Sequence, residues 1–447
     1  MLYTNKDLKR LIIPLVFEQL LAILVGMVDT VMIAGVGEAA VSGVSLVDTI
    51  NILVINITAA LSTGGAVVTG HFLGQKDTEN ASKSAWQLVL FSVCLSLIVT
   101  VLFLGAHGPL LRIVFGQVEP EVMSNASVYL VITALSICPL AIYNACAALF
   151  RAMSDSKTTM YIAIAMNLIN LVGNAILIYG AKIGVAGAAI ATTLSRIVAA
   201  VIIMYLMFHS DRVINFRGQV TWKINGRIIK KILYIGIPNS LENSLFQLGK
   251  ILLLSLISTF GTYSIAANAV CNTLAGFNIL PGQAINMALL SVASMCIGAG
   301  DFNQARYYTK KLIRIAIGCV GAISAILFVF APWILKIYQL TPQTESLAIQ
   351  VLRYHTVLAV IFWVPSFTLP NTLRAAGDVV WTMIIAASSM WIFRIGFAYV
   401  FSSYFNGGLL GVWVAMTIDW AFRTLCYGMR YHRNKWERYA DSGRAGT

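Results

Sequence analysis

Long apolar stretches follow one another along the whole chain, and short polar segments separate them. Each stretch is long enough to cross the hydrocarbon core of a bilayer as a helix, which takes about 20 residues. The pattern predicts an all-α polytopic membrane protein with twelve transmembrane helices. The predicted spans cover residues 11–34, 42–72, 84–107, 123–150, 158–180, 186–208, 228–258, 264–297, 307–335, 346–372, 379–403 and 409–430.

The second half of the chain repeats the first. Pro14 and Glu18 recur 224 residues later as Pro238 and Glu242. Repeated halves are typical of secondary transporters, whose substrate site lies near the midplane of the membrane between the halves. We therefore expect two pseudo-symmetric six-helix bundles. The predicted domains are an N-lobe (1–208), a cytoplasmic linker (209–227), a C-lobe (228–432) and a cytoplasmic tail (433–447).

Composition and charge agree with a membrane protein. Hydrophobic residues make up 58% of the chain and charged residues 11%. The net charge of +13 follows from membrane topology rather than from nucleic-acid binding, because Lys and Arg collect on one side of the predicted spans. The other face carries Arg112, Lys182 and Lys336. This asymmetry predicts a plasma (inner) membrane protein with both termini in the cytoplasm, and we expect a monomer.

Asp29 lies in the middle of the first predicted span and is the strongest candidate for chemistry. A carboxylate in hydrocarbon must be neutralised by a proton or compensated by a cation or polar partners. The same span contains no Lys or Arg, which disfavours a fixed ion pair within the helix. The alternative is an acid satisfied by neighbouring hydroxyl groups purely for packing. We predict a coupling site for H⁺ or Na⁺ at Asp29, and no other metal site.

Two amides and a hydroxyl are candidate partners for this acid. Asn170 and Asn174 are spaced i, i+4, which places both side chains on one face of the fifth span. Thr192 in the sixth span adds a hydroxyl group. Their oxygens are suited to coordinating Na⁺ or to holding a protonated carboxyl. Interhelical packing, or a bond from the threonine to its own helix, is the alternative.

Further polar residues predict a substrate cavity. Glu18 lies eleven residues before Asp29 and projects from the same helix face. Its counterpart in the second half is Glu242, so both acids are expected to face a shared cavity and to attract cationic substrates. Lys250 is an alternative partner that would neutralise Glu242. The predicted cavity residues are Glu18, Glu242, Gln247 and Met287, of which the methionine fits close packing at least as well.

The second half is not a chemical copy of the first. The position that matches Asp29 is Leu253, so we expect the ion site in one lobe only. Asp419 and Arg423 are spaced i, i+4 and are predicted to pair within their helix. The roles of Lys250 and Arg394, which also lie in apolar surroundings, are not assigned by the sequence.

Several segments resemble the multidrug and toxic compound extrusion (MATE) family, and the resemblance covers essentially the whole chain. The similar segments are 27–35, 64–74, 150–155 with its repeat 373–378, 170–174 and 184–192. The resemblance implies a V-shaped pair of bundles that exports organic cations in exchange for H⁺ or Na⁺. It also implies a cation site formed by Asp29, Asn170, Asn174 and Thr192. One branch of the family has a further acid about one turn after Glu242, where this chain has Phe246 and Gln247, so the resemblance does not extend to a C-lobe cation site.

We therefore expect a secondary active multidrug efflux transporter that works by alternating access. Its expected partners are small organic cations and the lipid bilayer, with no cofactor and no nucleic acid. The alternative is a flippase or exporter of lipid-linked or cell-wall precursors on a related fold, which would need a strongly basic cavity. The chain contains no nucleotide-binding loop of the Walker type, no pore-lining repeat and no catalytic constellation, so we do not expect an enzyme or a channel.

Overall fold

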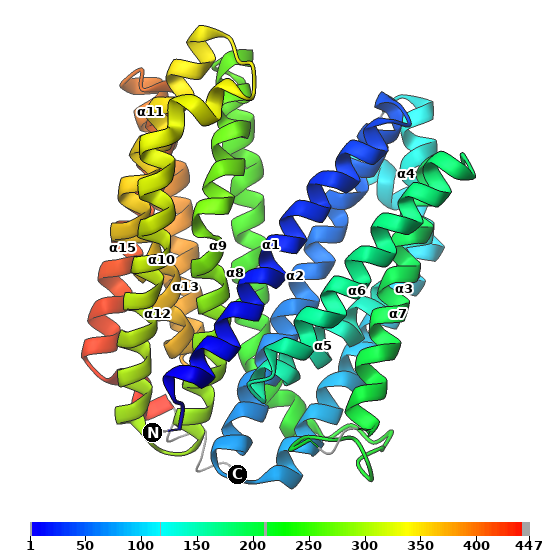
Figure 1. Cartoon of the computed structure of the whole chain (residues 1–447), viewed down its shortest axis with the longest axis vertical. Coiled ribbons are helices and arrows are strands. Elements are labelled where there is room, and N and C mark those ends of the chain that lie inside the picture. The colour runs from blue at the N-terminus through cyan, green and yellow to red at the C-terminus, as the bar shows by residue number, and fades with distance from the viewer. Residues whose placement is uncertain (1, 117, 210–211, 440–447) are drawn as a thin grey trace. The chain divides into compact units, whose positions relative to one another are not determined.

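The structure, a computed structural model, describes residues 2–116, 118–209 and 212–439. In these ranges the chain forms helices and no strands (Figure 1). The chain divides into two compact units. The N-terminal unit runs from Tyr3 to Ser240, and the C-terminal unit begins at Leu241. The boundary lies inside a helix rather than in the predicted linker, and the predicted lobe limits at 208 and 228 stay a prediction.

The N-terminal unit contains the helices that correspond to the first six predicted spans. They are α1 (Asn5–Ala34), α2 (Glu38–Gly74), α3 (Thr78–Phe115), α4 (Pro120–Ala134), α5 (Ile137–Ala152), α6 (Ser156–Asn174) with the π-helical segment η1 (Ala175–Gly180), and α7 (Gly184–His209). The helix α8 (Gly226–Ser258) begins in this unit and continues into the next.

The C-terminal unit repeats this order, with more π-helical segments. They are α9 (Thr262–Gly298), α10 (Phe302–Lys336), α11 (Pro342–Leu358), η2 (Ala359–Trp363), α12 (Val364–Ala375), α13 (Val379–Ser389), η3 (Met390–Gly396), α14 (Phe397–Tyr399), η4 (Val400–Tyr404) and α15 (Gly408–His432).

These helices confirm the predicted all-α membrane fold with twelve spans. In the described part of the chain, ten helices are individually long and apolar enough to cross a bilayer. The fourth predicted span is the pair α4 and α5, which is bent by 50°. The seventh is α8, whose 33 residues include several ionisable side chains.

Repeated caps begin the corresponding helices of the two units. Asp77 accepts a hydrogen bond from the backbone N–H of Asn80 and so caps α3. Asp301 accepts one from the N–H of Gln304 and caps α10 in the same way. A carboxylate in this position satisfies a backbone donor that has no partner inside the helix and interacts favourably with the helix dipole. The repeat in the sequence therefore places equivalent turns at equivalent helix starts.

The first part of α8 packs closely against α2 in the N-terminal unit. A Cβ atom on Gly64 would lie 2.4 Å from the carbonyl oxygen of Ile232, and one on Gly236 would lie 3.3 Å from the Cα of Leu61. Small residues let helix backbones approach each other in a membrane, where apolar burial gives no net drive for association. This contact explains why the boundary between the units lies within α8.

The segment predicted as a linker also packs on the N-terminal unit where it is described. Phe216 is fully buried, with its ring centroid 5.3 Å from that of Trp86 in an edge-on contact. Gln87 Nε2 donates to the carbonyl oxygen of Lys223, and Gln87 Oε1 accepts from the N–H of Asn225. These contacts hold the segment against α3.

Candidate functional site

The four residues predicted for the coupling site lie together in the N-terminal unit. Asp29 comes from α1, Asn170 and Asn174 from α6, and Thr192 from α7. Asn174 Nδ2 donates to Asp29 Oδ1 at 2.8 Å. With its amide oriented to satisfy both neighbours, Asn170 donates to the two carboxylate oxygens of Asp29 at 2.9 and 3.0 Å and accepts from Thr192 Oγ1 at 3.1 Å. The i, i+4 spacing of the asparagines directs both amides at the same carboxylate.

In the described part of the chain, Asp29 has no direct basic partner. Among the described residues its carboxylate forms no ion pair with a lysine or arginine. Asn174 Oδ1 is buried and finds no hydrogen-bond donor in the same set of residues. An acceptor oxygen without a donor beside a carboxylate fits a hard cation, because such cations prefer carboxylate and carbonyl oxygens, or a group that brings a proton.

A cavity of about 230 Å³ lies beside this carboxylate within the N-terminal unit. Its walls come from α1, α2, α4, α6 and α7. The polar lining residues are Asp29, Thr30, Ser45, Asp48, Tyr129, Asn174, Thr192 and Arg196. A polar cavity inside a transmembrane bundle gives an ion a hydrated place next to its protein ligands.

Asp48 and Arg196 line this cavity and are not predicted from the sequence as site residues. Both are ionisable residues inside predicted spans. That alone is a signal, because ionisable residues are rare in hydrocarbon and usually face a cavity or a partner. Arg196 Nη1 donates to Ser136 Oγ at 2.7 Å, which ties the guanidinium to the wall of the bundle. The cavity therefore contains two carboxylates and one fixed cation.

Glu18, predicted for the substrate cavity, has partners inside the N-terminal unit. Arg151 Nη1 lies 3.5 Å from Glu18 Oε1, and Thr159 Oγ1 donates to Oε2 at 3.1 Å. The side chains of Glu18 and Arg151 are 12% and 15% exposed. A mostly buried acid beside a guanidinium keeps its charge without a further ligand.

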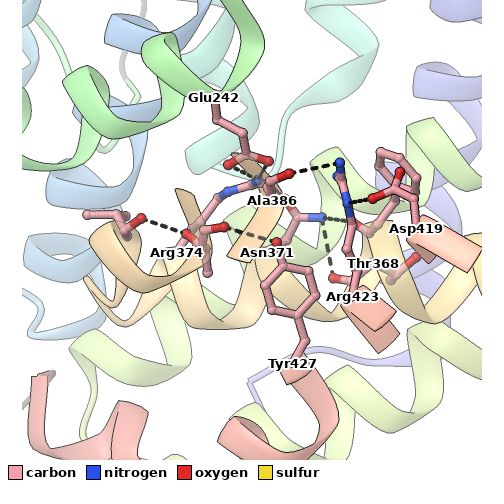
Figure 2. A network of polar contacts seen from close by, with 11 residues as sticks. Glu242, Thr368, Asn371, Arg374, Ala386, Asp419, Arg423 and Tyr427 are labelled. Atoms are coloured by element: carbon pink, nitrogen blue, oxygen red, sulfur yellow. Dashed lines mark hydrogen bonds and ion pairs between the residues drawn. The ribbon is translucent and has the colours of Figure 1, made fainter. Parts of the chain in front are cut away.

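Glu242 has the corresponding partner in the C-terminal unit (Figure 2). Arg374 Nη2 donates to both carboxylate oxygens of Glu242 at 2.7 Å. Arg374 Nη1 also reaches Asn371 Oδ1 at 3.3 Å. Arg374, and not Lys250, therefore neutralises Glu242. The repeated sequence thus builds the same glutamate–arginine pair twice, between α1 and α5 and between α8 and α12.

Asp419 and Arg423 form the predicted pair within α15 (Figure 2). Arg423 Nε lies 2.8 Å from Asp419 Oδ1, and Arg423 Nη2 donates to the carbonyl oxygen of Ala386 at 3.2 Å. Ser389 Oγ also donates to this carboxylate, which is fully buried. Arg394 approaches the same acid from η3, with Nη1 at 3.7 Å from Asp419 Oδ2.

The remaining predicted cavity residues are Gln247 on α8 and Met287 on α9, both half-buried in the C-terminal unit. Glu18 belongs to the other unit. A substrate cavity shared by Glu18, Glu242, Gln247 and Met287 therefore stays a prediction. The described residues contain no group of three or more His, Cys, Asp or Glu side chains that would hold a metal ion.

The chain matches the family model MatE twice, over residues 14–176 and 238–400. The two matches begin 224 residues apart, which is the offset of the repeat in the sequence. A relative from Thermotoga maritima, the "Probable multidrug resistance protein NorM", is 26% identical over 440 residues, which cover 98% of this chain and 94% of that protein.

Solved structures show the same fold. An outward-facing multidrug resistance MATE family transporter of the MOP superfamily superimposes with a TM-score of 0.90 at 23% identity, over 98% of this chain and 96% of that one. A MOP superfamily transporter from Pyrococcus furiosus, described by a reverse polarity of its binding pocket, gives a TM-score of 0.87 at 23% identity, over 95% of each chain. The two family matches together cover most of the sequence, so this chain belongs to the MatE family and is a membrane transporter rather than an enzyme.

Proposed function

We propose that the protein is a secondary active multidrug exporter that takes up H⁺ or Na⁺ at Asp29 and releases organic cations by alternating access. The observation that carries the proposal is the Asp29 carboxylate, which two asparagine amides hold and which forms no ion pair with a lysine or arginine among the described residues. An acid in this state gains more from a proton or a cation than one that already has a salt bridge. It is therefore the residue best suited to sense the coupling ion.

The surroundings of Asp29 support an ion of either kind. For Na⁺, the carboxylate and the buried Asn174 Oδ1 offer oxygen ligands from two helices. For H⁺, protonation of Asp29 adds a donor that Asn174 Oδ1 lacks in its present surroundings. In both cases the ion changes the hydrogen bonds between α1 and α6, so its binding is linked to the packing of these two helices.

Coupling requires that the ion and the drug favour opposite states of the transporter. A ligand that binds both states equally well shifts neither population. We infer that the coupling ion favours the arrangement in which α1 and α6 close on Asp29, and that the drug favours the other one. The relative named as a multidrug resistance protein supports a broad substrate range.

The basic residues on one side of the spans support insertion in the plasma (inner) membrane with both termini in the cytoplasm. A cysteine introduced at Gly218, in the loop before α8, tests this orientation. Membrane-impermeant maleimide should label it in inside-out vesicles and not in intact cells. Labelling in intact cells would reverse the topology.

Transport in proteoliposomes tests the coupling. The purified protein is reconstituted with a cationic dye inside, and proton and sodium gradients are imposed separately. We expect uphill dye movement under one of the two gradients. Dye movement that follows only its own concentration gradient under both conditions would exclude ion coupling.

A second candidate function is export of lipid-linked or cell-wall precursors. One observation favours it: around Phe246 the C-terminal unit carries more basic than acidic side chains. A basic interior suits phosphate groups better than organic cations. In the same vesicles, movement of a lipid-linked pyrophosphate and not of the dye would favour this function.

A further inference from the structure

The charged side chains that cluster in the C-terminal unit do not balance in sign. Glu242 is neutralised by Arg374, and Asp419 is neutralised by Arg423 (Figure 2). Each of these pairs has at least one contact of 2.8 Å or less. Two further cations remain: Arg394 shares Asp419 with Arg423 through a longer contact of 3.7 Å, and Lys250 forms no ion pair among the described residues. The cluster therefore carries an excess of two positive charges.

Arg394 is poorly satisfied where it lies. The residue is 7% exposed, and its buried Nε finds no acceptor among the described residues. Its Nη1 has the thioether sulfur of Met390 at 4.0 Å, which is a weak acceptor. Its Nη1 lies 3.7 Å from Asp419 Oδ2, which is beyond hydrogen-bond distance, whereas Arg423 and Ser389 both bond the other oxygen, Oδ1. A buried guanidinium with unused donors is costly unless a ligand supplies acceptors.

Lys250 and Arg394 both lie close to the aromatic ring of Phe246. The ring of Phe246 has Lys250 Nζ at 5.1 Å from its centroid, the guanidinium of Arg394 at 5.0 Å and that of Arg423 at 5.6 Å. A phenyl face attracts each cation, but it cannot remove the repulsion between three like charges. Lys250 is exposed and makes no hydrogen bond or ion pair within the described ranges, so its ammonium group is accessible to a ligand.

We propose that Arg394 and Lys250, which both lie against the ring of Phe246, form a binding site for one anionic group of the phosphate monoester type. A phosphate monoester carries about 1.5 to 2 negative charges at neutral pH and so matches the excess of two positive charges. Arginine supplies a planar set of donors for the phosphate oxygens, and lysine supplies a point charge at the exposed edge. Phe246 provides an apolar surface for the chain attached to the phosphate.

The fold does not need these residues, which favours a binding role. At the offset of 224, Lys250 corresponds to Gly26, Phe246 to Ala22 and Arg394 to Asn170. The N-terminal unit builds the same helices without a basic residue at any of these places. Arg394 also lies in the π-helical segment η3, and such segments occur frequently at functional sites. This site goes beyond the proposed function, because its occupation does not require a coupling ion.

Binding measurements on the full-length protein in a neutral maltoside detergent test the site. The probes are 1-oleoyl lysophosphatidic acid, the zwitterionic lysophosphatidylcholine with the same acyl chain, and inorganic phosphate. We expect lysophosphatidic acid to bind at least about tenfold more tightly than lysophosphatidylcholine. Binding of inorganic phosphate as well would identify a site for free anions, and binding of the lipid alone would identify a site for amphiphiles. Equal affinity for the two lipids without phosphate binding would overturn the proposal.

Variants assign the binding to these two residues. We expect Lys250→Gln and Arg394→Gln each to weaken the binding of whichever anionic probe binds by about tenfold, and Arg394→Lys to weaken it less. The matched control is Lys336→Gln, which removes an exposed cation from the end of α10. Should Arg394→Gln not fold, Lys250→Gln decides, since this side chain is exposed. An equal loss in Lys250→Gln and Lys336→Gln would mean non-specific attraction and would refute the site.

Discussion

The two units use the same helices for opposite charge arrangements. In the N-terminal unit, an acid at Asp29 meets two amides and has no basic partner. In the C-terminal unit, the position of Asp29 is occupied by Leu253, and Arg394 lies at or directly beside the position of Asn170. The N-terminal unit thus offers oxygen ligands to a cation, whereas the C-terminal unit offers unused donors to an anion.

What the units share is the scaffold. Both have a glutamate–arginine pair at the same place in the repeat and an aspartate cap on the corresponding helix. The duplication has therefore kept the contacts that hold helix ends together and changed the groups within the membrane. A polar or charged side chain in the membrane interior has few possible hydrogen-bond or ionic partners. A change in the sign of its charge therefore changes the class of ligand that it can bind.

A single inserted residue accompanies this difference. Asp155 and Asp378 are 223 residues apart, whereas Gly184 and Gly408 are 224 apart, so the second half has one extra residue in this interval. The segment η3 lies there, and its counterpart in α6 is regular α-helix. A π-helical turn, with its i→i+5 bonding, takes up one additional residue without ending the helix. The insertion therefore lies in the turn that holds Arg394.

The largest expected effect comes from removing the acid that only the N-terminal unit has. We expect Asp29→Asn to reduce uphill dye export in proteoliposomes to the level of protein-free vesicles, because asparagine keeps the size and cannot take up a proton or balance Na⁺. The matched control is Leu253→Met at the equivalent position of the other unit, a volume-conserving change that should leave export within about twofold. Retained uphill export by Asp29→Asn would remove this acid from the mechanism.

The sequence was sufficient to predict the twelve helices, since each is a long apolar segment whose signal is local. It also placed Asp29, Asn170, Asn174 and Thr192 in one site, although through the family resemblance rather than through spacing alone. The geometry that joins them depends on three helices and on an amide orientation, neither of which a linear pattern contains.

The sequence was less informative about ion pairs between distant segments. Lys250 was the candidate partner of Glu242 because it is near in the chain, but Arg374 reaches across from α12. The roles of Asp48 and Arg196 in the cavity were missed because their neighbours lie on other helices. The two partners of the Glu242–Arg374 ion pair are 132 residues apart, so no local sequence pattern predicts that they meet.

The second prediction compares the two glutamate–arginine pairs. Breaking the bidentate pair with Glu242→Gln leaves Arg374 mostly buried without its acid, and we expect a loss of about 2–4 kcal/mol in unfolding free energy. Glu18→Gln breaks a single 3.5 Å contact and should cost less, about 1–2 kcal/mol. Unfolding in detergent measures both values. The double variant Glu242→Gln/Arg374→Gln should lose less than the sum of the single variants.

Dye binding shows whether Glu242 also serves the substrate. If the acid faces the cavity as predicted, Glu242→Gln weakens the binding of a monovalent cationic dye by about 5- to 150-fold and leaves the binding of a neutral analogue nearly unchanged. An equal loss for both ligands would restrict Glu242 to its structural pair with Arg374.

The third prediction concerns the close approach of α2 and α8 in the N-terminal unit. Gly64→Ala would place a methyl group 2.4 Å from the carbonyl oxygen of Ile232, so α2 and α8 must separate. We expect a loss of about 1–3 kcal/mol, measured by thermal unfolding in detergent. The equivalent position in the second half is Ala288, which already carries the methyl group.

The control for this variant is a glycine in the corresponding helix of the other unit. Gly276 in α9 has open space around the position of a Cβ atom. Gly276→Ala should therefore be neutral or stabilise by up to about 1 kcal/mol through helix propensity. A similar loss in both variants would mean that the tight approach of α2 and α8 contributes nothing.

The smallest effect is expected where the units are alike. Hydrogen bonds from the backbone and side chain of Asn80 hold the pKa of Asp77 below its usual value of 3.8, and Gln304 lowers the pKa of Asp301 in the same way. A carboxyl group whose pKa is lower in the folded state stabilises the fold fully above the unfolded-state pKa, and this contribution disappears as the pH falls through the folded-state value. We expect Asp77→Ala and Asp301→Ala each to cost about 0.5–1 kcal/mol at neutral pH, since both caps lie near the surface. Thermal unfolding as a function of pH should show each deficit shrinking below a pH of about 4. Unequal costs for the two caps, or a deficit that does not depend on pH, would show that the symmetry of the scaffold does not extend to its energetics.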